Sequence, residues 1–137
     1  ALFLCLKMAA GDQMDILALP EYTILIQERQ GDEQMGVGMI SLWDLEYRLN
    51  AGIPMQLVDL RTPSDYQAGH IRGAVNIPYS NLASRLPELA SGPAVIFYCA
   101  RGGISLQAAR MAAQRGIPAA SVMSGITYYR GAHMIGN

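Results

Sequence analysis

The sequence has 137 residues, which corresponds to one domain able to bury a core without disulfide bonds. Apolar residues make up 51% and charged residues 15% of the chain, a balance that argues against intrinsic disorder. Ten basic side chains against eleven acidic ones give a net charge of −1, so we expect neither nucleic acid nor a membrane surface as a partner.

At the start of the chain, residues 1–36 form an extension for which two interpretations stay open. The apolar run at residues 2–6 is too short to span a bilayer, which takes about 20 residues. Lys7 follows this run, whereas a signal peptide carries its positive charge before the apolar segment. We expect the extension either to belong to a neighbouring unit or to be an arm packed on a domain formed by residues 37–137.

From residue 39 onward, short apolar runs alternate with helical patterns, as is typical of a parallel sheet covered by helices. The sequence therefore predicts an α/β fold with the three layers of an α/β/α sandwich. Ser41 and Asp44 have the spacing of a capping box and begin a helix that ends near Gly52. A strand is predicted at residues 55–60, and the Thr-Pro-Ser-Asp segment at residues 62–65 starts the next helix.

The second half of the chain contains an unbroken apolar, β-rich run at residues 94–98. Such a run is typical of a central strand that is buried on both faces. The other elements are predicted at residues 74–77 (strand), 80–89 (helix, bent or ended by Pro87), 105–114 (helix, ended by Gly116), 120–123 (strand) and, after a turn at Gly125, in a terminal helical segment.

The segment that carries chemistry directly follows the central strand and reads Cys-Ala-Arg-Gly-Gly-Ile-Ser at residues 99–105. Ligands of parallel sheets bind at the carboxyl ends of the strands. Gly102 and Gly103 let successive amides turn inward to form an anion-binding nest, and the start of the next helix adds further free N–H groups. Because such a ring stabilises a thiolate, Cys99 is predicted to be a nucleophile, whereas Cys5 is expected to be inert.

The motifs around this loop resemble those of the rhodanese family of sulfurtransferases, and the resemblance extends from residue 39 to residue 130. The first matching segment is Asp59-Leu-Arg61 followed by residues 65–78 (DYQAGHIRGAVNIP), which resemble D-x-R and E-[FY]-x-x-G-H-I-x-G-A-x-N-I-P. The second is residues 95–99 with Gly102 and Ser105, which resemble the strand and the loop C-x-x-G-x-[RT]-S. The third is residues 124–126, which resemble a closing G-G-[IV] turn.

The resemblance implies the rhodanese fold, with a central, mostly parallel five-stranded sheet, and an enzyme similar to the thiosulfate sulfurtransferases. Cys99 would take the outer sulfur of thiosulfate or of a persulfide donor, which can be a protein, and pass it to a thiol or a cyanide-like acceptor. Ser105 would hydrogen-bond that sulfur and also cap the following helix. The residues implied to bind the persulfide are Ala100, Arg101, Gly102, Gly103, Ile104 and Ser105.

Two departures from the family pattern keep an alternative open. Ile104 stands where active thiosulfate transferases often have a cationic or polar residue, so thiosulfate itself is in question as the donor. Arg101 either supplies this charge or points into solvent. The Cys-x-Arg-Gly-Gly run is also similar to the rhodanese segment of the tRNA 2-selenouridine synthases, although the chain has no P-loop. The alternative to a catalytic domain is a non-catalytic or regulatory rhodanese module of a larger protein.

A phosphatase or arsenate reductase of the same fold is disfavoured by the length of the loop. The phosphatases that share this fold have a loop one residue longer, with an arginine six positions after the cysteine to clamp a phosphate. Here that sixth position is Ser105, which cannot make a bidentate contact.

Neither a metal site nor a cofactor is predicted. The two cysteines and two histidines are spread over the chain, and the Gly36-Val-Gly38 segment lacks the third glycine of a dinucleotide fingerprint. Two cysteines are also too few for a disulfide scaffold, so we expect a reducing, cytoplasmic location.

The remaining polar and aromatic candidates are interpreted as scaffold. Asp59 and Arg61 are expected to hold the edge of the sheet by hydrogen bonds, with an influence of Asp59 on the thiolate as the alternative. His70 is expected to bond backbone groups instead of acting as a base, and His133 has no visible partner. Trp43 and the methionines are predicted to pack in the core.

Overall fold

The computed structural model describes residues 37–136. The predictions for residues 1–36, including an inert Cys5, lie outside these described residues. Within the described part of the chain, no helix is both long enough and apolar enough to cross a membrane.

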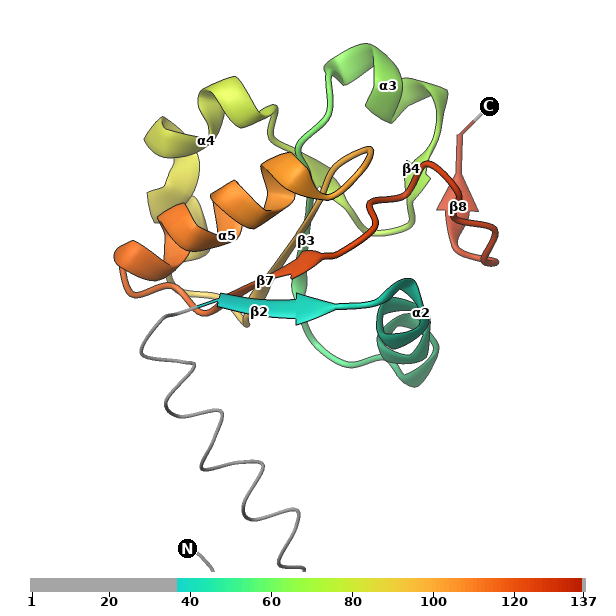
Figure 1. The fold of residues 1–137 in the computed structure, drawn as a ribbon, viewed down its shortest axis with the longest axis horizontal. Helices are drawn as coiled ribbons and strands as arrows, with labels where there is room; N and C mark the ends of the chain where they lie inside the picture. The colour runs from blue at the N-terminus through green and yellow to red at the C-terminus, as the bar shows by residue number, and fades with distance from the viewer. Residues whose placement is uncertain (1–36, 137) are drawn as a thin grey trace, which may run out of the picture. The chain divides into compact units, whose positions relative to one another are not determined.

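A parallel sheet of five strands forms the centre of the domain, in the order β2-β7-β6-β3-β5 (Figure 1). The predicted central strand is confirmed, because β6 lies in the middle of the sheet and all of its residues are buried. Since the strands are parallel, their carboxyl ends meet at one edge. The strands are β2 (Val37–Ile40), β3 (Gln56–Asp59), β5 (Val75–Asn76), β6 (Val95–Tyr98) and β7 (Ala119–Val122).

Helices cover both faces of the sheet, which confirms the predicted α/β/α sandwich. They are α2 (Leu42–Ala51), α3 (Pro63–Ala68), α4 (Tyr79–Arg85), the 3-10 helix η2 (Leu86–Leu89) and α5 (Gly103–Gln114). One core joins the sheet to α4 and α5 through Leu82 and Ala108. The other core lies on the opposite face, where Leu45 of α2 is fully buried.

The predicted helix starts are confirmed by their caps. Ser41 and Asp44 form a reciprocal capping box at the start of α2, and the Thr62 side chain accepts a hydrogen bond from the Asp65 amide at the start of α3. The helix predicted at residues 80–89 is divided near Pro87, where α4 gives way to η2.

The terminal helix predicted after Gly125 is wrong. The chain instead makes turns and ends in β8 (Met134–Ile135), which pairs antiparallel with β4 (His70–Ile71). Contacts with α2 hold this segment, because the Tyr129 hydroxyl donates to Glu46 and His133 Nε2 lies 2.8 Å from Asn50 Oδ1. The approach is close at Gly131, where a Cβ would collide with the side chains of Tyr129 and Glu46.

The prediction that Trp43 packs in the core is also wrong, because this residue is 85% exposed. The buried face of α2 runs through Leu42, Leu45 and Leu49, at the spacing of one side of a helix. Trp43 falls between these positions and points outward with Tyr47. Among the methionines, Met55 and Met111 pack partly against the two cores, whereas Met39, Met123 and Met134 are exposed, contrary to expectation.

Candidate active site

Cys99 lies at the carboxyl end of the central strand, directly after the last residue of β6. Its side chain is 5% exposed and belongs to the core beneath α4 and α5. The loop that follows it runs into α5, so the thiol lies at the junction of a buried strand and a helix start. Such a junction brings unpaired helix amides close to the strand end.

Gly102 gives the loop its shape. Its φ of 104° is in the left-handed region, and its amide donates a hydrogen bond to the Cys99 sulfur over 3.0 Å. A Cβ at Gly102 would collide with the carbonyl group of Met123, which follows β7. Gly103 is different, because it begins α5 as an exposed residue and a Cβ there would meet nothing within 4 Å. Of the two glycines predicted to shape the loop, only Gly102 is required by its conformation.

Ser105 is fully buried. The prediction that it caps the following helix is wrong. The cap position belongs to Gly102, and Ser105 is already inside the first turn of α5. Its hydroxyl donates to the Gly102 carbonyl over 3.1 Å and lies 2.7 Å from the hydroxyl oxygen of Ser121.

Hydrogen bonds determine the acidity of the Cys99 thiol. Burial alone raises the pKa of Cys99, but the hydroxyl and amide of Ser105 and the amides of Gly102 and Arg101 favour the thiolate. Together these donors outweigh burial, so the pKa of Cys99 lies below its ordinary value. A buried thiol with this acidity is well suited to nucleophilic chemistry.

A turn at residues 125–127 braces the loop from the side of β7. The Ile126 amide donates to the Cys99 carbonyl over 3.1 Å, and both the amide and the hydroxyl of Thr127 donate to the Ala100 carbonyl, over 3.1 and 2.7 Å. Gly125 has a φ of 70°, and a Cβ there would collide with the Ala100 carbonyl. The resemblance to a closing turn marked residues 124–126, but no sequence signal marked Thr127 or Ser121 as partners of the loop.

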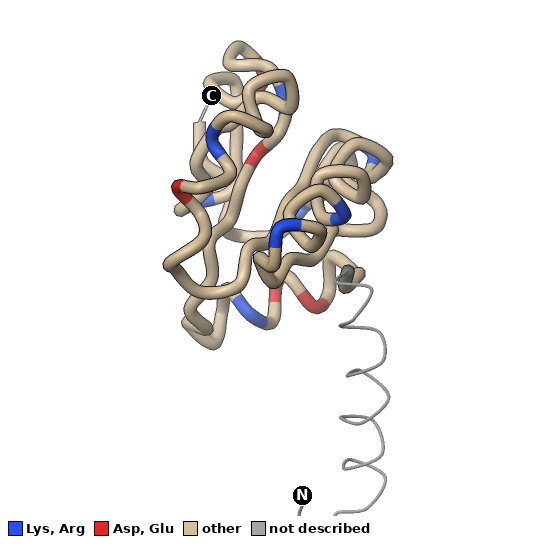
Figure 2. Tube along the Cα trace, turned by 90° about the vertical axis from the view of Figure 1, so that its left-hand side faces the viewer, with Lys and Arg blue, Asp and Glu red and all other residues tan. Residues whose placement is uncertain are grey.

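The outer rim of the loop is formed by residues that the structure leaves exposed. Ile104 is 46% exposed, and Ala100 and Arg101 are exposed as well. Basic and acidic positions are interspersed over the domain in the view of Figure 2. Within the loop at residues 99–105, Arg101 is the one charged residue that a ligand meets.

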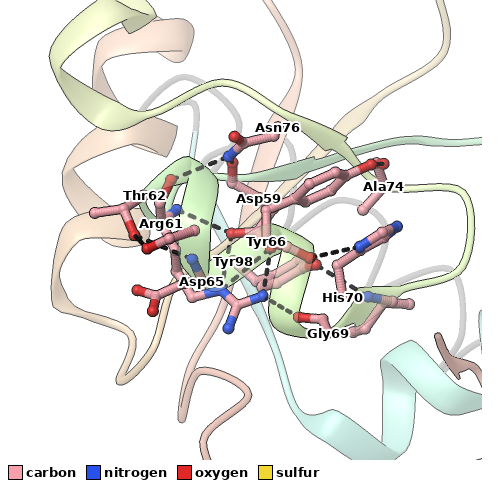
Figure 3. A network of polar contacts seen from close by, with 12 residues as sticks. Asp59, Arg61, Thr62, Asp65, Tyr66, Gly69, His70, Ala74, Asn76 and Tyr98 are labelled. Carbon is pink, nitrogen blue, oxygen red and sulfur yellow. Dashed lines mark hydrogen bonds and ion pairs between the residues drawn. The ribbon is translucent and has the colours of Figure 1, made fainter. Parts of the chain in front are cut away.

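Asp59 and Arg61 form a partly buried ion pair on the other face of the sheet (Figure 3). The guanidinium group binds both carboxylate oxygens of Asp59 at 2.7–3.1 Å and donates to the Gly69 carbonyl over 2.7 Å. Side chains alternate along a strand, so Asp59 shares its face with Tyr98, whereas Cys99 points to the opposite face. Burial and, after it, the Asp59 charge raise the pKa of Tyr98. The pair therefore lies at the carboxyl end of β3 and away from the thiol.

Because the Asp59 side of this ion pair is fully buried, we expect Asp59→Ala to lower the free energy of unfolding by about 2 to 3 kcal/mol. The value lies below that of a completely buried pair because Arg61 stays partly exposed. Urea unfolding followed by circular dichroism measures the change. Glu88→Ala is the control, since it removes the exposed partner of Arg85 and should leave the unfolding midpoint unchanged. Equal effects of the two substitutions would contradict a special role of the buried pair.

The two histidines serve the scaffold. His70 Nδ1 lies 2.8 Å from the Tyr66 carbonyl oxygen and its ring stacks on Tyr66, which confirms the predicted backbone contact. His133 does have partners, contrary to expectation, because its Nε2 lies 2.8 Å from Asn50 Oδ1 and 3.7 Å from Glu46 Oε2. Across residues 37–136, no three histidine, cysteine or carboxylate side chains gather as metal ligands.

The sequence and the fold together place the chain among known proteins. The profile of the Rhodanese-like domain family matches residues 44–129, which include the Asp59–Arg61 pair, the Cys99 loop and the closing turn. The chain belongs to the rhodanese-like domain family. The rhodanese-like domain protein of Staphylococcus aureus has the same fold, with a TM-score of 0.66 at 24% identity, over 73% of this chain and 98% of that one.

Curated relatives of this rhodanese-like domain differ in kind. The Sulfurtransferase of Allochromatium vinosum is 32% identical over 80 residues, which cover 58% of this chain and 75% of that protein. The HTH-type transcriptional regulator Rv0324 of Mycobacterium tuberculosis is 46% identical over 65 residues, or 47% of this chain and 28% of the regulator. The chain spans less than half the length of two of the curated relatives that it matches.

Proposed function

We propose that this rhodanese-like domain is a sulfurtransferase in which Cys99 carries the transferred sulfur as a persulfide. The observation that carries the proposal is the buried Cys99 sulfur, which accepts a hydrogen bond from the Gly102 amide and has a lowered pKa. The relative named as a sulfurtransferase supports the same activity. The active domain would comprise residues 37–137, with residues 1–36 as an extension.

In the first step, the Cys99 thiolate attacks the outer sulfur of the donor. With thiosulfate, the sulfur–sulfur bond of the donor breaks, sulfite leaves with the electron pair, and Cys99 becomes a persulfide anion. In the second step, a thiol or cyanide attacks the terminal sulfur, and Cys99 leaves as the thiolate with which it began. The cycle needs no cofactor and no outside oxidant, and a reducing compartment such as the cytoplasm keeps Cys99 available as a thiol.

The loop would stabilise the charge that moves between these states. The Gly102 amide already points at the Cys99 sulfur in the free protein, so no rearrangement is needed when the thiolate forms. The persulfide anion places its charge one bond further out, toward the helix start at Gly103. Preorganised N–H donors of this kind serve any anionic sulfur species, whichever donor supplies it.

The test of this function is the intact mass of the protein after brief incubation with a sulfur donor. One sample receives thiosulfate, and a parallel sample receives a cysteine desulfurase that carries a persulfide. We expect a gain of one sulfur atom that cyanide reverses. A chain that gains no sulfur from either donor would overturn the proposal. That result would favour the second candidate, a regulatory rhodanese module, which rests on the likeness to the transcriptional regulator.

The rim of the loop favours a persulfide over thiosulfate as the donor. Ile104 exposes an apolar side chain where a doubly charged donor would approach, and only Arg101 offers a cation among the loop residues. We expect Ile104→Arg to raise the rate of sulfur uptake from thiosulfate by about fivefold to tenfold, since one added unit charge at close range contributes about 1 kcal/mol in water. Uptake from a persulfide donor, which carries one negative charge instead of two, should rise less.

Ile104→Leu is the control for this substitution, because it keeps the rim apolar and should leave both rates unchanged. Stopped-flow uptake assays with each donor at low salt give the comparison. If Ile104→Arg and Ile104→Leu had the same rate with thiosulfate, the charge of the rim would have no part in donor choice.

A further inference from the structure

Ser121 is a buried hydroxyl to which the proposed reaction assigns no role. It lies on β7, next to the central strand, and is fully buried. Its oxygen lies 2.7 Å from the hydroxyl oxygen of Ser105, the usual distance of a hydrogen bond between two hydroxyl groups. The Ser105 hydroxyl in turn donates to the carbonyl of Gly102, the residue whose amide donates to the Cys99 sulfur. The same hydroxyl contributes to lowering the pKa of Cys99.

The direction of this hydrogen bond follows from counting protons. Each hydroxyl has one proton to donate. If Ser105 donated to Ser121, its proton would be unavailable both to the Gly102 carbonyl, which lies 3.1 Å away, and to the Cys99 sulfur. If Ser121 donates, the Ser105 proton stays free for either of these acceptors. Within residues 37–136, Ser105 is the one hydrogen-bond partner that the structure gives the Ser121 side chain, so only this direction satisfies both hydroxyls.

We infer that Ser121 is a positioning residue, whose hydroxyl donates to Ser105 and thereby directs the Ser105 proton toward the sulfur of Cys99. In the free protein the Ser105 hydroxyl donates to the Gly102 carbonyl. When the sulfur carries a negative charge, the charge attracts this proton, and the hydrogen bond from Ser121 keeps the Ser105 oxygen in place. The part of this inference that concerns the persulfide rests on the proposed function, whereas the part that concerns the free thiol does not.

Hydrogen bonds, and not charged side chains, favour the thiolate form of Cys99. Asp59 lies on the opposite face of the sheet and is paired with Arg61. Arg101 is exposed, and it is its backbone amide that contributes to the acidity of Cys99. From α4 and α5, the core around the thiol receives leucine and alanine side chains such as Leu82 and Ala108.

The test is a double-mutant cycle of Ser121→Ala and Ser105→Ala, made in a Cys5→Ser background so that Cys99 is the single thiol. The readout is the pH dependence of the rate at which iodoacetamide alkylates Cys99. We expect Ser121→Ala to raise the apparent pKa of the thiol by about half a pH unit, as befits one neutral hydrogen bond. In the Ser105→Ala background the same substitution should have no effect, because the proton that it directs is gone.

Ser121→Thr serves as the rescue variant, since it keeps the hydroxyl, and its thiol should titrate as in the unsubstituted protein. Thermal unfolding of each variant shows whether it is folded. Equal pKa shifts from Ser121→Ala with and without Ser105, or no shift in either background, would overturn the inference. If the shifts follow the expected pattern but no variant takes up sulfur, the proposed function fails and the positioning role stands.

Discussion

Replacing Cys99 with serine is expected to abolish sulfur uptake, so that intact mass measurement detects no gain of a sulfur atom. The serine oxygen can still accept the hydrogen bond that the Gly102 amide gives to the sulfur, so the loop keeps its shape. A neutral hydroxyl, however, is a weak nucleophile near neutral pH, and an alcohol cannot form a persulfide. The variant thus separates the chemistry of the sulfur atom from the geometry of the loop.

Cys5→Ser is the matched control, because it removes the other thiol of the chain and should leave uptake unchanged. A protein whose sulfur gain survived Cys99→Ser and disappeared with Cys5→Ser would show that the nucleophile has been assigned to the wrong cysteine. In the protein with Cys99 intact, the uptake rate should rise with pH while the thiol deprotonates and then level off. Because the pKa of Cys99 is lowered, this plateau should begin at a lower pH than for an ordinary thiol.

Local signals in the sequence were sufficient to predict the main elements of the fold. The cap at Ser41, the proline after Thr62 and the apolar run at residues 94–98 each act over a few neighbouring residues. A parallel arrangement follows from alternating strands and helices, and the chemistry-bearing loop follows from its place after the most apolar strand. These inferences needed no knowledge of distant contacts.

Features that depend on distant contacts were not predicted. The pairing of β4 with β8 joins segments far apart in the chain, and neither segment has the length or pattern of a strand. Trp43 is exposed because of the rotation of α2 about its axis, which the helix signals do not fix. Ser121 and Thr127 reach the loop only because β7 lies next to β6.

The position of Ser105 shows how one residue can change the interpretation of a neighbour. Ser105, which follows Gly102, Gly103 and Ile104, was predicted to cap the helix. The left-handed conformation of Gly102 instead starts the helix earlier and places Ser105 inside it. Its hydroxyl then faces inward, where it donates to the Gly102 carbonyl, lies against Ser121 and lowers the pKa of Cys99. Gly102 therefore shapes the loop and also determines that Ser105 lies inside the first turn of α5.

Gly102→Ala should be the most disruptive substitution in the loop apart from loss of the thiol itself. A side chain at a φ of 104° is strained by about 1 to 3 kcal/mol, and the new Cβ would also collide with the Met123 carbonyl. Unfolding should begin at a lower temperature. The displaced loop would move the Gly102 amide away from the sulfur, so the pKa of Cys99 should rise. Thermal unfolding and the pH dependence of alkylation measure the two effects.

Gly103→Ala, one residue further on, provides the decisive comparison, because it adds the same methyl group to the same loop. Here the backbone is already helical and the new Cβ would meet open space, so stability should stay constant or rise slightly. The pKa of Cys99 should also stay constant, because the amide that bonds the sulfur belongs to Gly102. If both alanine variants raised the pKa of the thiol equally, the effect would come from the loss of loop flexibility. A rise with Gly102→Ala alone would show that the left-handed conformation of one residue holds the amide against the sulfur.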